Sequence, residues 1–181
     1  MIKVWADTHF NHTGILKYTS RPYFNVWQMN EALIALWNGA VSEKDEMWLL
    51  GDFAFYGAGS TPPEQIFERL NGHKHLVIGN HDEKNPKVLA LKWESKEKLV
   101  TLKENGIRAE ACHYPLATWK KSAHGALMLH GHCHGNLREQ IPHRFDVGVD
   151  VFQQPVSLVK LAEIASKQEF KVVDHHGEKK G

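Results

Sequence analysis

The chain has 181 residues, of which 42% are hydrophobic and 24% are charged, and its formal net charge is +1. These values are typical of a globular protein, so they exclude a disordered chain and a collagen-like fibre. A net charge near zero gives no general attraction to a long polyanion such as duplex DNA, although it leaves room for an enzyme that acts on one phosphodiester at a time.

Length and cysteine count set further limits. We interpret residues 1–181 as a single domain, which is long enough to bury one substantial core. Two cysteines form at most one disulfide, which is too few to stabilise a chain of this length, so we expect reduced thiols and a cytoplasmic location. No apolar run approaches the ~20 residues that span a bilayer, so we expect no membrane partner. The compositional outlier is histidine, with 13 residues.

The first half of the chain alternates short apolar runs with helical patterns. The helical pattern is clearest after residue 25, where Met29, Leu33, Leu36 and Trp37 recur at helical spacing. A second helix is marked by prolines at its start and a glycine at its end. The expected strands are 2–6, 46–52 and 74–82, and the expected helices are 26–37, 61–72 and 86–98. This alternation predicts βαβ units with parallel strand pairing.

The second half contains more strand patterns and is richer in hairpins. Asn105-Gly106 is a strong hairpin signal between two apolar runs, so 98–115 predicts a pair of antiparallel strands. The further expected elements are strands over 125–132, 144–152 and 170–174, and a helix over 157–168. The whole pattern predicts a mixed α/β domain with two sheets face to face and helices outside.

Five apolar segments end abruptly in side chains that bind metals. The segments are "VWADTH", "WLLGDF", "LVIGNHD", "AEACHYP" and "LMLHGHCHG". Ligand sites in open α/β sheets form beyond the carboxyl ends of the strands, so five strand ends can bring together polar residues that lie far apart in sequence. We therefore expect these side chains to share one pocket.

The last segment, "LHGHCHG", raises a choice between metal ligands, a thiol site and a histidine-rich surface loop. His132 and His134 are two residues apart, as are Asp7 and His9, and residues i and i+2 of an extended chain point to the same side. On this reasoning each pair directs two ligands into one pocket, while Cys133 faces away and packs behind the site.

The donor set combines nitrogen and oxygen ligands and contains no thiolate. Its members are Asp7, His9, Asp52, Asn80, His113, His132 and His134. Such a set suits Mn, Fe, Ni or Zn better than Ca or a structural zinc. Seven donors are too many for one tetrahedral ion, so the set favours two divalent ions that share a carboxylate. A bridging hydroxide and a phosphate oxyanion can neutralise the charge that remains.

The motifs "DTH", "GD", "GNHD", an isolated histidine and "GHCH", in this order, resemble the five blocks of the calcineurin-like metallophosphoesterase superfamily. The blocks span Asp7 to His134, and "SRPYF", "MNEALIALWN" and "DVGVDVF" are similar to the small bacterial and phage members. Two positions depart from the usual pattern, because Ala6 replaces a serine and Cys133 replaces a small residue. Neither departure removes a residue of the donor set.

The resemblance implies an αββα sandwich without a cap domain and with two metal sites. It implies a first metal held by Asp7, His9, Asp52 and His134, and a second held by Asp52, Asn80, His113 and His132, with Asp52 as the bridge. It also implies that His81 stabilises the phosphoryl oxygen or protonates the leaving group, a role that suits an imidazole. Asp82 would fix this histidine or its turn.

We therefore expect an enzyme that hydrolyses a phosphodiester or phosphomonoester through attack of a metal-bridging hydroxide, with Mn as a suitable assay metal. The chain has little spare length for a cap, which favours a diester or an extended substrate. His12 and Arg21 could contact the substrate phosphate, since arginine suits a bidentate grip. Asp146 and Asp150 of "DVGVD" are expected to accept backbone or supporting hydrogen bonds.

Two alternative functions stay open at this point. A nuclease acting on RNA or DNA would use the same chemistry, although the chain lacks a basic stretch interleaved with aromatic residues. A non-catalytic scaffold would keep the fold, but such members are expected to lose ligands or His81, and this chain has them all. A (β/α)8 barrel with a similar His-x-His pair is excluded by length, since such barrels have ~250 residues. The oligomeric state is unknown from sequence.

Overall fold

The computed structural model describes residues 1–57 and 59–170. Its elements in chain order are β1 (Ile2–Trp5), α1 (Ile15–Tyr18), α2 (Val26–Ala40), β2 (Glu46–Leu49), α3 (Pro63–Glu68), β3 (His73–Val77), α4 (Pro86–Leu89), β4 (Lys96–Glu97), β5 (Leu99–Glu104), β6 (Ile107–Cys112), the 3-10 turn η1 (Ser122–His124), β7 (Leu127–His130), β8 (Arg144–Asp146), β9 (Val156–Ser157) and α5 (Leu158–Ala165). The expected strand over 170–174 lies, apart from its first residue, outside the described residues. No helix within the described residues has the length and apolarity needed to cross a membrane.

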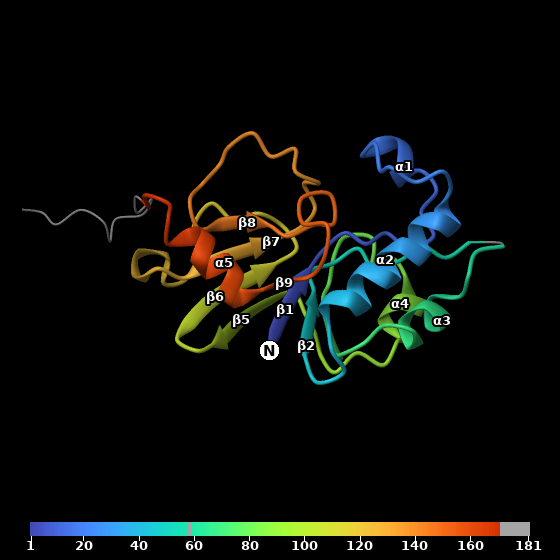
Figure 1. The fold of residues 1–181 in the computed structure, drawn as a ribbon, viewed down its shortest axis with the longest axis horizontal. Helices are drawn as coiled ribbons and strands as arrows, with labels where there is room; N and C mark the ends of the chain where they lie inside the picture. The colour runs from blue at the N-terminus through green and yellow to red at the C-terminus, as the bar shows by residue number, and fades with distance from the viewer. Residues whose placement is uncertain (58, 171–181) are drawn as a thin grey trace, which may run out of the picture.

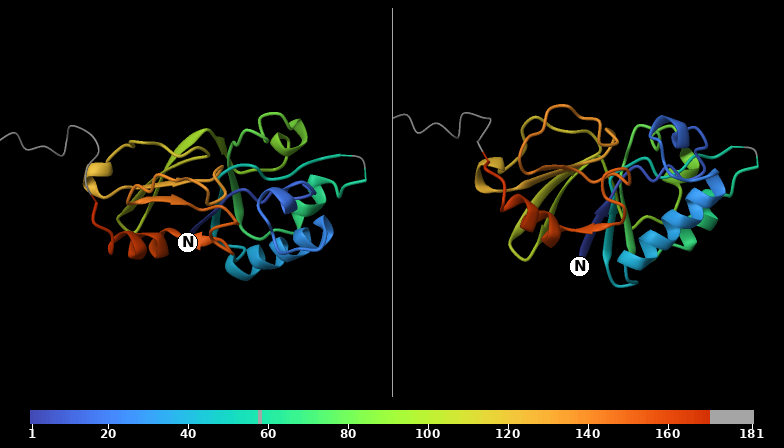
Figure 2. Two further views of the ribbon diagram at one scale, coloured as in Figure 1. Left: turned by 90° about the horizontal axis from the view of Figure 1, so that it is seen from above. Right: turned by 45° about the horizontal axis from the view of Figure 1, so that its top comes forward.

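Two mixed β-sheets pack face to face, which confirms the expected fold class. The first has the order β4-β3-β2-β1-β9, and its strands are parallel except for β9. The second has the order β5-β6-β7-β8, with β5 and β6 antiparallel and the others parallel. Helices α2, α3 and α4 lie on the first sheet (Figure 1). In Figure 2, strands of the first sheet lie between α2 and α5.

Alternation along β1 explains how one strand joins two cores. Val4 is buried in the core between the sheets, whereas Trp5 points to the opposite face and packs edge-on against Trp37 of α2 at a ring distance of 6.3 Å. Successive side chains of a strand point to opposite faces, so a run that is apolar throughout predicts burial on both sides. Leu158 and Leu161 of α5 join the core between the sheets.

The segment 86–98 was expected to be one helix, and this prediction is wrong beyond Leu89. Helix α4 spans a single turn, and residues 96–97 instead form β4 at the edge of the first sheet. Trp93 explains the change, because its indole packs against Phe53 and Phe67 and donates a hydrogen bond to the carbonyl of Val88. This anchor returns the chain to the sheet, so tertiary packing overrides a helix-compatible composition.

The second half contains one hairpin among the described residues, fewer than expected. The Asn105-Gly106 turn joins β5 and β6 with both residues at positive φ, as the sequence predicted. Beyond it, β6, β7 and β8 run parallel. The expected strand over 144–152 ends at Asp146, whose carboxylate accepts hydrogen bonds from the backbone N–H groups of Gly148 and Gly135. These bonds turn the chain out of the sheet and bring the following residues to the site described next.

Candidate functional site

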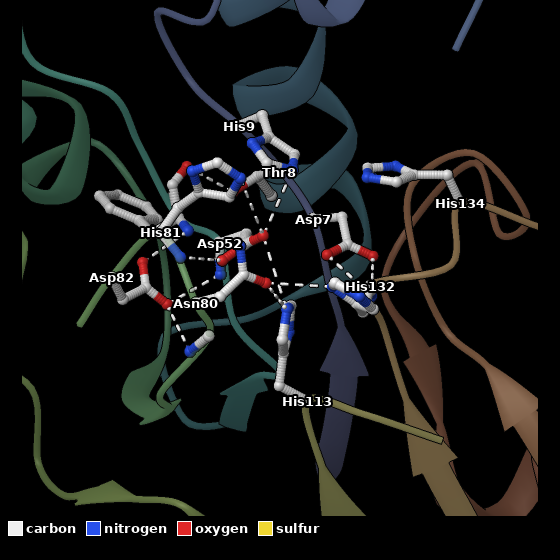
Figure 3. A network of polar contacts seen from close by, with 12 residues as sticks. Asp7, Thr8, His9, Asp52, Asn80, His81, Asp82, His113, His132 and His134 are labelled. Atoms are coloured by element: carbon white, nitrogen blue, oxygen red, sulfur yellow. Dashed lines mark hydrogen bonds and ion pairs between the residues drawn. The ribbon is translucent and has the colours of Figure 1, made fainter. Parts of the chain in front are cut away.

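The predicted donor residues all follow strand ends, and the structure brings them together at one edge of the sandwich. Asp7, Asp52 and Asn80 follow β1, β2 and β3 of the first sheet, and His113 and His132 follow β6 and β7 of the second. The backbone of Ala6 pairs with that of Gly148, which joins the two sheets at this edge. Figure 3 shows carboxylates and imidazoles from both sheets gathered around Asp52.

The backbone that presents these side chains is left-handed and not extended, which corrects the reasoning from strand alternation. Asp7, His9, Asp52, His132 and His134 have φ values between 47° and 69°. A non-glycine residue at positive φ is uncommon, although Asp and His tolerate it better than most, and such residues cluster at functional sites. Asp7 and His9 converge through tight turns after β1, while Thr8 points inward and donates a hydrogen bond to the carbonyl of Phe53.

Asp52 occupies the centre of the site. Its Oδ2 lies 3.6 Å from His9 Nε2, 3.5 Å from His113 Nε2 and 4.0 Å from His81 Nε2. Its Oδ1 accepts a hydrogen bond of 3.0 Å from the backbone N–H of His81. One oxygen therefore faces imidazoles from both halves of the donor set, which is the position a shared ligand needs.

Asp7 is equally central, which the sequence did not indicate. Two groups of side chains have ligand atoms within 4.8 Å of one another, Asp7 with His9 and His134, and Asp7 with Asp52 and His113. The carboxylate of Asp7 is fully buried and accepts the backbone N–H of His132 at 3.1 and 2.9 Å. Asp7 thus lies within reach of both halves of the site. Neither cysteine belongs to such a group among the described residues.

Asn80 connects two histidines from the second sheet. Its Oδ1 lies 3.0 Å from His113 Nε2 and 3.0 Å from His132 Nδ1. The other nitrogen of His113, Nδ1, lies 2.8 Å from the main-chain carbonyl of Leu50, so it is the nitrogen that carries the proton. With the proton on Nδ1, Nε2 of His113 keeps a lone pair on the side that faces Asn80 Oδ1 and Asp52 Oδ2, as a metal-binding imidazole requires.

The carboxylate of Asp150 orients the ring of His134, as the carbonyl of Leu50 orients that of His113. Nδ1 of His134 lies 2.7 Å from Asp150 Oδ2, and Asp150 is held in turn by Nε and Nη2 of Arg21, both at 2.8 Å. Burial pushes the pKa of Asp150 upward, but the hydrogen bonds from His134 and Arg21 outweigh it and keep the pKa below its ordinary value. Asp150 therefore stays ionised and orients His134. Its supporting role agrees with the expectation for "DVGVD".

Arg21 lies behind the site, which corrects its expected place at the substrate phosphate. The residue is only 7% exposed. Besides its two bonds to Asp150, the guanidinium donates to the carbonyls of Asp7 and Thr8 and to the sulfur of Met29. All of its N–H donors are thus used within the protein. Arg21 ties the turn after β1 to the loop that follows β8.

Asp82 supports the site through the main chain. One carboxylate oxygen accepts the N–H groups of Gly79 and Asp52 at 2.9 and 2.8 Å, and the other accepts that of Phe53 at 2.9 Å. Burial raises the pKa of Asp82 to about 6, although these hydrogen bonds oppose the rise. Asp82 therefore clamps the loop after β2 to the loop after β3, and these loops carry Asp52, Asn80 and His81.

His81 and His12 lie at the open side of the site. The side chain of His81 is 43% exposed, so its ring reaches solvent beside Asp52. His12 stacks on Phe55 with ring centres 3.9 Å apart, and Phe55 lies 5.0 Å from the ring of His81. His12 is thus placed at the rim, where contact with a substrate is feasible. Phe55 was missed by the sequence reasoning, because one phenylalanine in "GDFAF" gives no signal that separates rim from core.

The burial of the donor groups tests whether divalent cations fit here. Both ring nitrogens of His9 are buried without a hydrogen-bond partner among the described residues. Burial raises the pKa of Asp7 well above its ordinary value, raises that of Asp52, and lowers that of His9 well below its ordinary value. Buried carboxylates beside neutral imidazoles lack positive charge, and a divalent cation supplies it while giving His9 a partner. The residues fit such ions.

Comparison with known protein families gives a match over nearly the whole chain. A family model described as calcineurin-like phosphoesterase matches residues 1–180. An uncharacterized protein from Methanocaldococcus jannaschii, MJ1445, is 32% identical over 169 residues, which cover 90% of this chain and 89% of that protein.

More distant relatives cover the chain equally well. The gene 66 protein of Mycobacterium phage D29 is 24% identical over 197 residues, covering 92% of this chain and 97% of that protein. The crystal structure of AQ665 from Aquifex aeolicus, described as a protein of unknown function, superposes with a TM-score of 0.72 at 22% identity. That match covers 91% of this chain and 98% of the other, and it shows a shared fold.

Proposed function

The chain belongs to the calcineurin-like phosphoesterase family, and from this premise we propose that it hydrolyses phosphodiesters with two divalent cations. The observation that carries the proposal is the position of Asp52 Oδ2, 3.6 Å from His9 Nε2 and 3.5 Å from His113 Nε2. One carboxylate oxygen between two buried imidazoles suits a ligand shared by two ions.

The two cations would be held by residues from both sheets. Asp7, His9, Asp52 and His134 would hold the first ion, and Asp52, Asn80, His113 and His132 the second, with Asp7 close to both. The ions would activate the attacking water and neutralise charge on the phosphate. The mixed nitrogen and oxygen set suits Mn, Fe, Ni or Zn.

His81 is the residue placed to handle a proton. Its ring lies beside the central carboxylate and opens to solvent on its other side, where an ester oxygen would approach. The proposal assigns it to stabilise the phosphoryl oxygen or to donate the proton that the leaving oxygen needs. His12, stacked on Phe55 at the same rim, would contact the substrate.

The exposure of the rim supports a diester over a small, enclosed monoester. The family match extends over 1–180, and the site opens to solvent at His81 instead of lying under a cap among the described residues. A phosphodiester carries an organic group on each side of the phosphate and needs such an open approach.

The test is turnover of bis-p-nitrophenyl phosphate by protein loaded with Mn, with metal content measured per chain. We expect about two ions per chain and activity that chelation removes and Mn restores. The matched variant is His81→Ala, which should keep the metal content and lower kcat by roughly 10²- to 10⁴-fold, the scale of general acid–base catalysis. Metal-loaded protein that is inactive with Mn, Ni, Fe and Zn would instead support the scaffold alternative.

A further inference from the structure

An aromatic groove leads away from the candidate active site. Its volume is about 390 Å³, and it lies between the start of α2 and the segment that follows Phe55. Trp27, Phe55 and Tyr56 line it, together with Asn11 and Asn30. Volumes of this size are typical of small-molecule sites that hold ligands between hydrophobic and aromatic side chains.

Phe55 connects this groove to the proposed chemistry. Its ring stacks on His12 at 3.9 Å and lies 5.0 Å from the ring of His81 and 6.1 Å from that of His9. Because Phe55 also lines the groove, the groove adjoins the rim at which His12 and His81 lie. The groove is therefore placed to receive one organic arm of a phosphodiester.

Two of the groove aromatics are strongly exposed to solvent. Trp27 is 67% exposed and Tyr56 is 47% exposed. By contrast, four of the other tryptophans are buried, namely Trp5, Trp37, Trp93 and Trp119. Large aromatic rings that are exposed to solvent beside a candidate active site are typical of surfaces on which a planar ligand stacks.

The polar groups of the groove favour stacking over hydrogen-bonded recognition. Asn30 donates to Oδ1 of Asn11, and the side-chain amide of Asn11 donates to the carbonyls of Phe55 and Thr61. These amides are largely satisfied within the protein, so they offer little to the edge of a ligand. The ammonium of Lys87 lies 3.3 Å from the centre of the Tyr56 ring and places a positive charge at the margin of the groove.

We propose that this groove binds the nucleobase of a nucleotidic phosphodiester, stacked against Trp27 and Tyr56, while the phosphate to be hydrolysed lies beside His81. The proposal rests on the proposed function, because it assigns the substrate class of that same site. A base supplies a planar ring that stacks irrespective of its identity, and nucleotides carry the negative charge that a lysine attracts. The small net charge of the chain favours a short oligonucleotide over a long duplex.

The reaction proposed for this substrate is simple hydrolysis. The oxygen of water forms a bond to phosphorus, one ester P–O bond breaks, and the leaving nucleoside oxygen takes up a proton. No oxidant, reductant or further co-reactant is needed. The groove contributes binding of the base, so removing its aromatic surface should raise KM for a nucleotidic substrate and leave kcat little changed.

The experiment compares Trp27→Ala with Phe24→Ala on two substrates. Phe24 is 93% exposed and does not line the groove, so it is a matched control for loss of an exposed ring. For hydrolysis of thymidylyl-(3′→5′)-thymidine by Mn-loaded protein, we expect Trp27→Ala to lower kcat/KM roughly tenfold to a hundredfold, the scale of one lost stacking contact. Phe24→Ala should behave as the unsubstituted protein, and both variants should hydrolyse glycerophosphocholine, a phosphodiester without a planar ring, at the same rate as the unsubstituted protein.

A binding measurement separates this proposal from the proposed function. Thymidylyl-thymidine added to metal-free protein should quench the fluorescence of the exposed Trp27, and the quenching should vanish in Trp27→Ala. Quenching by protein that hydrolyses neither substrate would support nucleobase binding in the groove and contradict the proposed hydrolase function. Hydrolysis of glycerophosphocholine and thymidylyl-thymidine, without quenching and without loss of activity in Trp27→Ala, would support the proposed hydrolase function and contradict the nucleobase groove.

Two further outcomes would also overturn the nucleobase assignment. Equal losses on both substrates in Trp27→Ala would show that the substitution disturbs the catalytic site itself and does not act through binding of a base. A dimer that Trp27→Ala converts to a monomer in size-exclusion chromatography would assign the exposed rings to an interface between copies of the chain.

Discussion

The two halves of the candidate site orient their histidines by different means. In the first half, which we call the Arg21-supported half, Nδ1 of His134 is held by the carboxylate of Asp150, and Arg21 holds that carboxylate. In the second, the main-chain-supported half, Nδ1 of His113 is held by the backbone carbonyl of Leu50. Both arrangements hold Nδ1 and thereby fix the orientation of the ring, but substitutions disturb them in different ways.

The Arg21-supported half depends on charges that lie far apart in sequence. Arg21 and Asp150 are 129 positions apart, and their side chains are 3% and 10% exposed. Breaking a buried pair leaves an uncompensated charge, so a single substitution can disable this half. A backbone carbonyl cannot be removed by substitution, so the main-chain-supported half can be disturbed only by moving the chain or filling its space. The difference predicts distinct responses to mutation.

Asp52→Asn should have the largest effect, because Asp52 faces both halves. Loss of its charge removes attraction for both cations, and we expect kcat to fall at least ~10²- to 10³-fold, as when a group that stabilises transition-state charge is lost. Metal content measured per chain should fall below two. Glu110→Gln is the control, because Glu110 is another buried carboxylate (3% exposed) and lies outside the site. Retention of two ions and full activity in Asp52→Asn would contradict a shared central ligand.

Gly51→Ala should disrupt the main-chain-supported half by filling space. Gly51 has φ +93°, and a Cβ there would lie 2.3 Å from Nδ1 of His113 and 2.8 Å from the Cα of Gly79. Left-handed strain and overpacking together should cost about 2–5 kcal/mol in the free energy of unfolding. Denaturant titration measures this loss, and metal titration should show weakened binding. Gly39→Ala is the control, since nothing lies within 4 Å of its Cβ position and α2 should gain up to ~1 kcal/mol.

Asp150→Asn should weaken the Arg21-supported half selectively. The neutral amide no longer balances the charge of Arg21, and its single acceptor oxygen cannot replace both carboxylate oxygens that bind Arg21 and His134. We expect a 10- to 100-fold loss of affinity for one of two ions, the usual effect of losing a partner of a metal-binding histidine. Calorimetric titration with Mn resolves the two binding steps.

Glu31→Gln provides the comparison for Asp150→Asn. This substitution breaks the ion pair between Glu31 and Arg69, which is also bidentate. The side chains of Glu31 and Arg69 are 39% and 46% exposed. An exposed pair contributes only about 0–1 kcal/mol, so metal binding and stability should stay unchanged. Equal behaviour of the two variants would show that Asp150 does not orient His134.

Titration of Asp82 should change the stability of the protein by a smaller amount. Its folded pKa of about 6 lies above the ordinary value of 3.8, so deprotonation favours the unfolded chain. Its contribution to stability is therefore fully present below about pH 4 and is lost as pH rises through about 6, by roughly 2–3 kcal/mol. We expect the stability of metal-free protein, measured against Asp82→Asn by urea titration, to fall over this range. A difference that does not change between pH 4 and 7 would contradict the raised pKa.

Local patterns in the sequence determined much of this fold. Hydrophobic alternation and helical spacing located β1, β2, β3 and α2, and Asn105-Gly106 located the hairpin of β5 and β6. These signals work because periodic burial and turn conformation depend on neighbouring residues. The same reasoning selected the donor residues, since strand ends share an edge whatever the details of packing.

Tertiary structure alone decided how these residues are arranged. The left-handed backbone at Asp7 and His132, the end of α4 before Trp93 and the pairing of Arg21 with Asp150 all depend on contacts between segments distant in sequence. Arg21 appeared suited to a phosphate, yet its donors are used by carbonyls and a carboxylate that only folding brings within reach. A sequence records which groups can bind, but burial and distance determine which partner each group meets.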